Sequence, residues 1–184
     1  MDRRLERAHT ELLILRLRQG ETEAFGTLIE MWEKRLFYFV RRIVGREEDA
    51  WDVLQETWLK VHGKIRQLRD PSAFPAWVYR IARHRAISHL RRTQRCELLL
   101  EDVPPQEIRE GTEPCRFSED DAERIHWGLD QLPLPQREAL TLFFLEGFSL
   151  SEIADITRVS TGTIKSRLHY GKRTLREIVK QGGS

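Results

Sequence analysis

Residues 148–176, FSLSEIADITRVSTGTIKSRLHYGKRTLR, are the most informative stretch of this sequence, and they predict two short helices joined by a tight turn. Ser149 and Glu152 have the spacing of a capping box, in which each side chain accepts a hydrogen bond from the other residue's backbone N–H. Ser160 is a favourable N-cap for the second helix. Arg158 stands near the turn position where such motifs usually carry glycine. A residue other than glycine at positive φ costs about 1 kcal/mol.

The second of these helices combines an apolar face with basic side chains. The apolar positions recur at spacings of four, three and four residues, which predicts one buried face: Ile164, Leu168, Gly171 and Leu175. Residues 158–176 contain six Lys or Arg residues and no acid. The first turn, residues 160–163, offers N–H groups and hydroxyls to a phosphate. The pattern predicts a helix-turn-helix whose second helix enters the DNA major groove. The alternative is a solvated amphipathic helix in an ordinary bundle.

The distribution of charge is more informative than its sum. The chain has 184 residues, of which 33% are charged and 40% hydrophobic, and its net charge is +2. This size supports one or two small domains. Residues 66–95 hold eight Arg against one acid, whereas residues 96–124 hold ten acids and three Arg. The alternation predicts two modules that face nucleic acid, separated by an acidic connector.

Several functional classes are not favoured by the composition. The two cysteines, Cys96 and Cys115, lie in or beside the connector, have no metal-binding spacing and are typical of a cytosolic protein without structural disulfides. There is no signal peptide, and no apolar run approaches the roughly 18–20 residues that span a bilayer. No nucleophile–base pair, metal-ligand set or phosphate-binding glycine loop is visible. We therefore expect a cytoplasmic protein that is not an enzyme, with no catalytic residue, metal or cofactor and no membrane insertion.

Helical periodicity dominates the chain, and no stretch shows the period of a strand, so the predicted fold class is all-α. Helices are predicted at 5–19, 21–44, 47–68, from Phe74 to about 92, at 119–132 and from Pro135 to 146. The first owes its apolar side to leucines: Leu5, Leu12, Leu13, Leu15 and Leu17. The third is predicted to bury a continuous stripe: Trp51, Leu54, Trp58, Val61, Ile65 and Leu68.

Two polar surfaces are candidate sites. The third helix carries what we call the acidic ridge, Asp49, Asp52, Gln55 and Glu56. Its simpler interpretation is a solvated face, because acids are favoured near a helix N-terminus. The fourth helix carries aromatic and basic residues on one stripe, Trp77, Arg80, His84 and Arg91, with Arg83 beside it. Such a stripe suits single-stranded or unstacking DNA, unless Trp77 belongs to the core and the arginines are merely solvated.

Four motifs in this order resemble the sigma factors of bacterial RNA polymerase, and the short length indicates the extracytoplasmic-function (ECF) group. The motifs are EEDAWDVLQETWLKVH, FPAWVYRIARHRAISHLRR, LPLPQREALTLFFLEGFSLSEIADI and TGTIKSRLHYGKRTL. The resemblance covers residues 22–175 except for the linker. It implies two helical domains, at 1–95 and 119–184, joined by a flexible linker at 96–118 that threads toward the polymerase active-site cleft. The implied partners are core RNA polymerase, double- and single-stranded promoter DNA and, as is common in the family, an anti-sigma factor.

The resemblance also implies roles for individual residues. The acidic ridge would dock on the clamp helices of the polymerase largest subunit. Recognition and melting of the downstream (minus-10) element would fall to Trp77, Tyr79, Arg80, Arg83, His84 and Arg91. The upstream (minus-35) element would be contacted by Thr161, Thr163, Lys165, Ser166, Arg167, His169, Tyr170 and Lys172.

Departures from the family pattern affect the expected promoter sequence. The family usually has Asn where His84 stands, and often Arg-Ala where Tyr170 and Gly171 stand. The rival function is a helix-turn-helix regulator that does not bind core polymerase. That function would account for residues 135–180 but not for the acidic ridge or the fourth helix.

Overall fold

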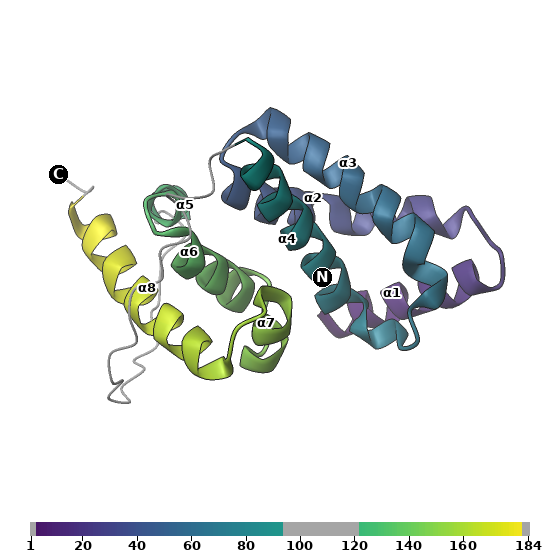
Figure 1. The fold of residues 1–184 in the computed structure, drawn as a ribbon. Helices are drawn as coiled ribbons and strands as arrows, with labels where there is room; N and C mark the ends of the chain where they lie inside the picture. The colour runs from purple at the N-terminus through teal and green to yellow at the C-terminus, as the bar shows by residue number, and fades with distance from the viewer. Residues whose placement is uncertain (1–2, 94–121, 182–184) are drawn as a thin grey trace. The chain divides into compact units, whose positions relative to one another are not determined.

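The computed structural model describes residues 3–93 and 122–181, and all of the regular structure in these ranges is helical (Figure 1). The chain divides into two compact units. The first contains α1 (Arg3–Arg18), α2 (Ala24–Val44), α3 (Glu47–Lys64) and α4 (Phe74–Arg92). The second contains α5 (Ala122–Asp130), α6 (Leu134–Leu140), α7 (Leu150–Thr157) and α8 (Thr161–Gln181), with a π-turn at Thr141–Leu145. The predicted all-α class is confirmed. The predicted linker, with Cys96 and Cys115, lies outside the described residues.

Aromatic packing holds the first unit together. Tyr79 of α4 is fully buried, with its ring 5.1 Å from that of Phe39 and 6.4 Å from that of Trp32, both on α2. Trp32 also meets the Phe74 ring at 5.6 Å, and its indole Nε1–H donates to Thr10 Oγ1 of α1 at 3.2 Å. Because a buried indole needs a partner for its N–H, this bond fixes α1 against α2.

The apolar faces of α1 and α3 differ from those predicted. In α1 only Leu13, Ile14 and Leu17 are buried with Thr10, whereas three leucines are exposed: Leu5, Leu12 and Leu15. Within the described residues α1 packs mainly on α2 and on the short turns between α3 and α4. These contacts do not cover all of the apolar side chains of α1. In α3 the buried stripe begins one residue earlier, at Ala50 and Val53. Trp51 is 41% exposed and lies against Phe37, with 4.3 Å between ring centroids. The helix also ends at Lys64, not at residue 68.

The second unit is built around α8. Its predicted apolar face is confirmed, since Ile164, Leu168, Gly171 and Leu175 are all buried. A Cβ on Gly171 would stand 3.1 Å from a methyl carbon of Leu140, so the glycine allows α6 and α8 to approach closely. The helix predicted from Pro135 changes at Thr141 into the π-turn, which leaves three large apolar residues partly exposed: Phe143, Phe144 and Leu145.

The helix-turn-helix has the local geometry predicted from its sequence. The backbone N–H of Ser149 donates to Glu152 Oε2 at 2.8 Å, and that of Glu152 donates to Ser149 Oγ at 3.3 Å, which completes the capping box. Ser160 Oγ accepts from the backbone N–H of Thr163 at 3.1 Å and caps α8. Arg158 adopts φ 62°, so the turn places a side chain in the left-handed region.

Replacing Arg158 with Gly is therefore expected to stabilise the protein by about 0.5–1 kcal/mol. Relief of the left-handed strain outweighs the greater entropy that glycine gives the unfolded chain. Urea unfolding followed by circular dichroism measures the change. Arg176→Gly, a change of the same residue type inside α8, is the control and is expected to destabilise by about 1 kcal/mol. A loss of stability in Arg158→Gly would contradict this explanation of the turn.

Candidate functional site

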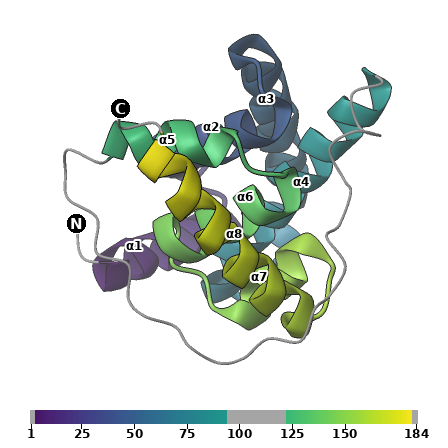
Figure 2. The same ribbon diagram turned by 90° about the vertical axis from the view of Figure 1, so that its left-hand side faces the viewer.

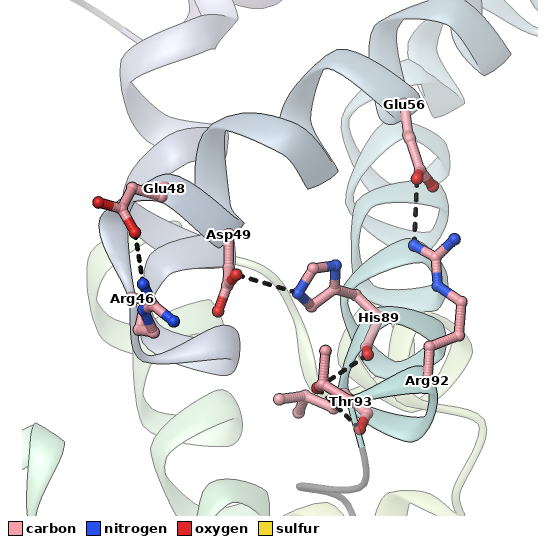
Figure 3. Close-up of polar contacts among 8 residues, drawn as sticks. Arg46, Glu48, Asp49, Glu56, His89, Arg92 and Thr93 are labelled. Carbon is pink, nitrogen blue, oxygen red and sulfur yellow. Dashed lines mark hydrogen bonds and ion pairs between the residues drawn. The ribbon is translucent and has the colours of Figure 1, made fainter.

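The acidic ridge has two sides, one that faces α4 and one that faces solvent. Asp49 Oδ1 lies 3.3 Å from His89 Nε2, and Glu56 lies 3.1 Å from Arg92 (Figure 3). Glu56 also lies 3.7 Å from Arg85. All three basic partners belong to α4. The other two members of the ridge, Asp52 and Gln55, are exposed. The ridge is therefore not one uniform surface: its outer face consists of Asp52 and Gln55, while Asp49 and Glu56 face α4.

The sequence pattern gave no indication of Arg85, His89 and Arg92 as partners of the ridge. The three residues follow one another on α4 at spacings of four and three, which places them on one side of that helix. Such spacing occurs on many helices, so it does not by itself identify the acids on α3 as partners.

The stripe on α4 reaches the surface, with one exception among the predicted DNA-contacting residues. His84 and Arg91 are exposed, and three others are half-buried: Trp77, Arg80 and Arg83. Tyr79 is fully buried in the aromatic core, which does not support its predicted contact with DNA. Tyr79 precedes the buried residues Ala82 and Ala86 by three and seven positions, so it lies on the packing face of α4.

Among the predicted DNA-contacting residues of α8, the exposed ones lie in the first two turns. Thr161 and Lys165 are exposed. Two hydroxyls are used locally, since Thr163 Oγ1 lies 2.9 Å from Ser160 Oγ and Ser166 Oγ donates to the Gly162 carbonyl at 3.2 Å. Lys165 is thus the exposed cation nearest the N-terminus of the helix among the described residues of α8.

Further along α8, aromatic and basic side chains pack on one another. The His169 and Tyr170 rings meet edge to face at 5.3 Å, and the Arg173 guanidinium lies 5.5 Å from the Tyr170 ring. Arg167 is only 9% exposed, which does not support its predicted DNA contact. It follows Ile164 by three residues and therefore shares the buried face.

Lys172 borders an apolar pocket of about 140 Å³ that the sequence did not predict. The pocket is lined by α5, α6, the π-turn and α8, through Ile125, Leu129, Leu140, Phe144, Leu145 and Leu175. The stem of a lysine covers apolar surface while its ammonium stays in water. Lys172 therefore covers apolar surface with its stem and carries a positive charge at the surface.

Comparison with known proteins identifies the family. Residues 28–96 match the family Sigma-70 region 2, and residues 123–175 match Sigma-70, region 4. The RNA polymerase sigma-H factor of Pseudomonas aeruginosa is 30% identical over 93% of this chain and 94% of its own length. The ECF RNA polymerase sigma-E factor of Haemophilus influenzae is 29% identical over 95% of this chain and 97% of its own length. The chain belongs to the ECF sigma factors.

A solved structure shares the architecture of this sigma factor. The sigma factor RpoE from Bartonella quintana, in complex with the anti-sigma factor NepR, matches with a TM-score of 0.67 and 26% identity. The match covers 86% of this chain and 98% of that one. The acidic ridge and α4 fall inside the region 2 match, and the helix-turn-helix falls inside the region 4 match.

Membership in this family makes the protein a transcription initiation factor, not an enzyme. No helix within residues 3–93 and 122–181 is both long and apolar enough to cross a membrane. The surfaces that matter for a sigma factor are those that meet polymerase and promoter DNA.

Proposed function

We propose that this sigma factor binds core RNA polymerase and directs promoter recognition and opening in the cytoplasm. The observation that carries the proposal is the exposure of one predicted contact surface in each matched region. In region 2 it is the outer face of α3, with Asp52 and Gln55, and in region 4 it is the N-terminal half of α8, with Lys165. A helix-turn-helix regulator would need only the second.

The polymerase contact is assigned to the outer face of α3. A carboxylate and a carboxamide one turn apart present acceptors to basic residues of a partner. The half-exposed Trp51 adjoins them and adds apolar area, which is where interfaces gain most of their binding free energy. The domain boundaries at 95 and 119 are part of this proposal.

The downstream element is assigned to α4. Trp77 supports base stacking, and three arginines neutralise phosphates: Arg80, Arg83 and Arg91. His84 is exposed where the family usually carries Asn. A neutral imidazole donates at one ring nitrogen and accepts at the other, so it reads a base edge with a geometry different from that of a carboxamide. The proposed downstream sequence preference therefore differs from that of relatives with Asn.

The upstream element is assigned to α8. Recognition helices of this motif contact base edges with their N-terminal residues. Lys165 lies one turn beyond Thr161 and is exposed, so it is the residue we assign to base readout. His169 and Tyr170 lie one turn further and are half-buried against each other, which suits contacts with the groove edge and the backbone.

Replacing Lys165 with Ala is expected to weaken binding to the preferred upstream element by about 1–3 kcal/mol, the usual loss for one base contact. Sequence discrimination at the contacted position should relax at the same time. Selection from a randomised upstream library with reconstituted holoenzyme measures both quantities. Lys180→Ala, which removes the same charge near the C-terminus of α8, should leave the selected sequence unchanged. An identical selected sequence for Lys165→Ala and the wild type would contradict the assignment.

An anti-sigma factor is a candidate partner. The matched sigma factor from Bartonella quintana was solved in complex with one, and a similar partner for this chain would hold it away from polymerase. Purification of the chain from cells of its source organism, followed by identification of stoichiometric small proteins, tests this part of the proposal.

Co-elution with core polymerase distinguishes the two functions. The purified chain is mixed with core enzyme and passed over a sizing column. A sigma factor is expected to elute with the core at one copy per enzyme and to be displaced by an excess of another sigma factor. A chain that elutes separately, yet binds duplex DNA by itself, would favour the regulator.

A further inference from the structure

Helix α4 has a second polar side, which faces α3 and not DNA. His89 and Arg92 lie on this side and contact Asp49 and Glu56 (Figure 3). Arg85 lies there too and contacts Glu56. The pair formed by Asp49 and His89 is the most enclosed of these contacts, with side chains 16% and 12% exposed. The pair formed by Glu56 and Arg92 lies nearer the surface, at 37% and 62% exposed. Figure 2 gives a second view of the two helices that carry these residues.

The burial of Asp49 separates it from Asp52, its neighbour one turn along α3. A carboxylate that is mostly covered and already faces an imidazole offers little surface to a second protein. Asp52 is exposed and offers both oxygens. The two acids, which the sequence places on one ridge, therefore have different surroundings. The covered acid suits a contact between helices, and the exposed acid suits a contact with another protein.

We propose that Asp49 is a positioning residue, which together with His89 fixes α3 against α4, and that the charge attracting core polymerase is that of Asp52. This inference rests on the proposed function, because it assigns different roles to residues of the proposed polymerase-binding surface. The pair sets the position of the Asp52 face relative to the DNA-facing stripe of α4. Residues in both surfaces thereby keep a fixed spacing when polymerase and promoter bind together.

The test compares two matched substitutions, Asp49→Asn and Asp52→Asn, which remove one charge each and preserve shape. Dissociation constants for core polymerase are measured by fluorescence anisotropy between 50 and 400 mM salt, on full-length protein. Asp49→Asn is expected to bind within threefold of the wild type with the same salt dependence, because this side chain is mostly covered and faces α4. Asp52→Asn is expected to bind at least tenfold more weakly with a shallower salt dependence, because a screened attraction has been removed.

Two substitutions of His89 test whether it positions α3. His89→Ala is expected to weaken core binding about threefold to tenfold without changing its salt dependence, at a temperature where circular dichroism shows the variant fully folded. His89→Gln keeps a polar side chain of similar length beside Asp49 and is expected to restore most of the affinity. Because Asp49 and His89 act through each other, combining Asp49→Asn with His89→Ala should cost less than the two losses added.

The outcomes separate this inference from the proposed function. Equal loss of affinity and of salt dependence in Asp49→Asn and Asp52→Asn would overturn the inference while supporting the proposed polymerase contact. Wild-type affinity in His89→Ala would also overturn the inference. Failure of the wild-type chain to bind core polymerase would overturn the proposed function, and this inference with it.

Discussion

Replacing Asp52 with Arg is expected to reduce the affinity for core polymerase about 100-fold or more. The new guanidinium would face the basic partner that the carboxylate attracts, and a like-charge contact in an interface costs several kcal/mol. Each 1.4 kcal/mol corresponds to a factor of ten in affinity. The exposure of Asp52 means that the fold should tolerate the change. Anisotropy titration with core enzyme measures the affinity, and circular dichroism measures the helical content.

The control for this substitution is Glu30→Arg, a reversal of the same sign at an exposed residue of α2 outside the acidic ridge. It is expected to bind core polymerase within threefold of the wild type. Strong binding by Asp52→Arg, or equal losses in both variants, would remove α3 from the polymerase interface.

Replacing Tyr79 with Ala is expected to destabilise the first unit by about 3–5 kcal/mol, the usual cost of truncating a buried aromatic residue. The side chain is fully buried against Phe39 and Trp32, so its removal leaves a cavity at the centre of the core. Because single domains are stable by only about 5–15 kcal/mol, this loss brings the unit close to unfolding at growth temperature. Chemical denaturation of the full chain, followed by tryptophan fluorescence, measures the change.

The contrasting variant is Ser88→Ala, a small change at a half-buried position of the same helix, which should alter stability by less than about 1 kcal/mol. If Tyr79→Ala were as stable as the wild type but failed to open promoters, the side chain would be a DNA contact, as the family pattern implied. The structure predicts instead that Tyr79→Ala first of all loses stability.

Local rules account for what the sequence predicted correctly. The capping box of α7 and the Ser160 cap depend on residues a few positions apart, so their spacing alone predicts them. The buried face of α8 repeats at helical spacing from Ile164 to Leu175, and all of its predicted apolar residues are buried. Such features need no knowledge of the neighbouring helices.

The errors arise where neighbouring helices decide which side of a helix is covered. Trp51 and Ala50 are adjacent in α3, and the spacing pattern favoured the larger residue, yet the contact with α2 and α4 covers Ala50. Tyr79 and Arg167 were assigned to DNA by the resemblance to the family, although each lies on the buried side of its helix. Periodicity identifies candidate faces but does not say which one meets a partner.

The candidate site was predicted in outline and not in detail. The charge and the spacing of the acidic ridge are visible in the sequence. The contact between Asp49 and His89 is not, because it joins two helices far apart along the chain and depends on how they cross. This contact changes the interpretation of the ridge, from four equivalent acceptors to an exposed pair beside an inter-helix junction.

Run-off transcription with reconstituted holoenzyme tests the central claim most directly. Core polymerase, with or without the chain, is supplied with fragmented DNA of the source organism, and the 5′ ends of the transcripts are mapped. The account predicts discrete start sites that require the chain, share an upstream and a downstream element, and disappear with Asp52→Arg. The same start sites from core polymerase alone, or no transcripts when the chain is bound to core polymerase, would contradict it.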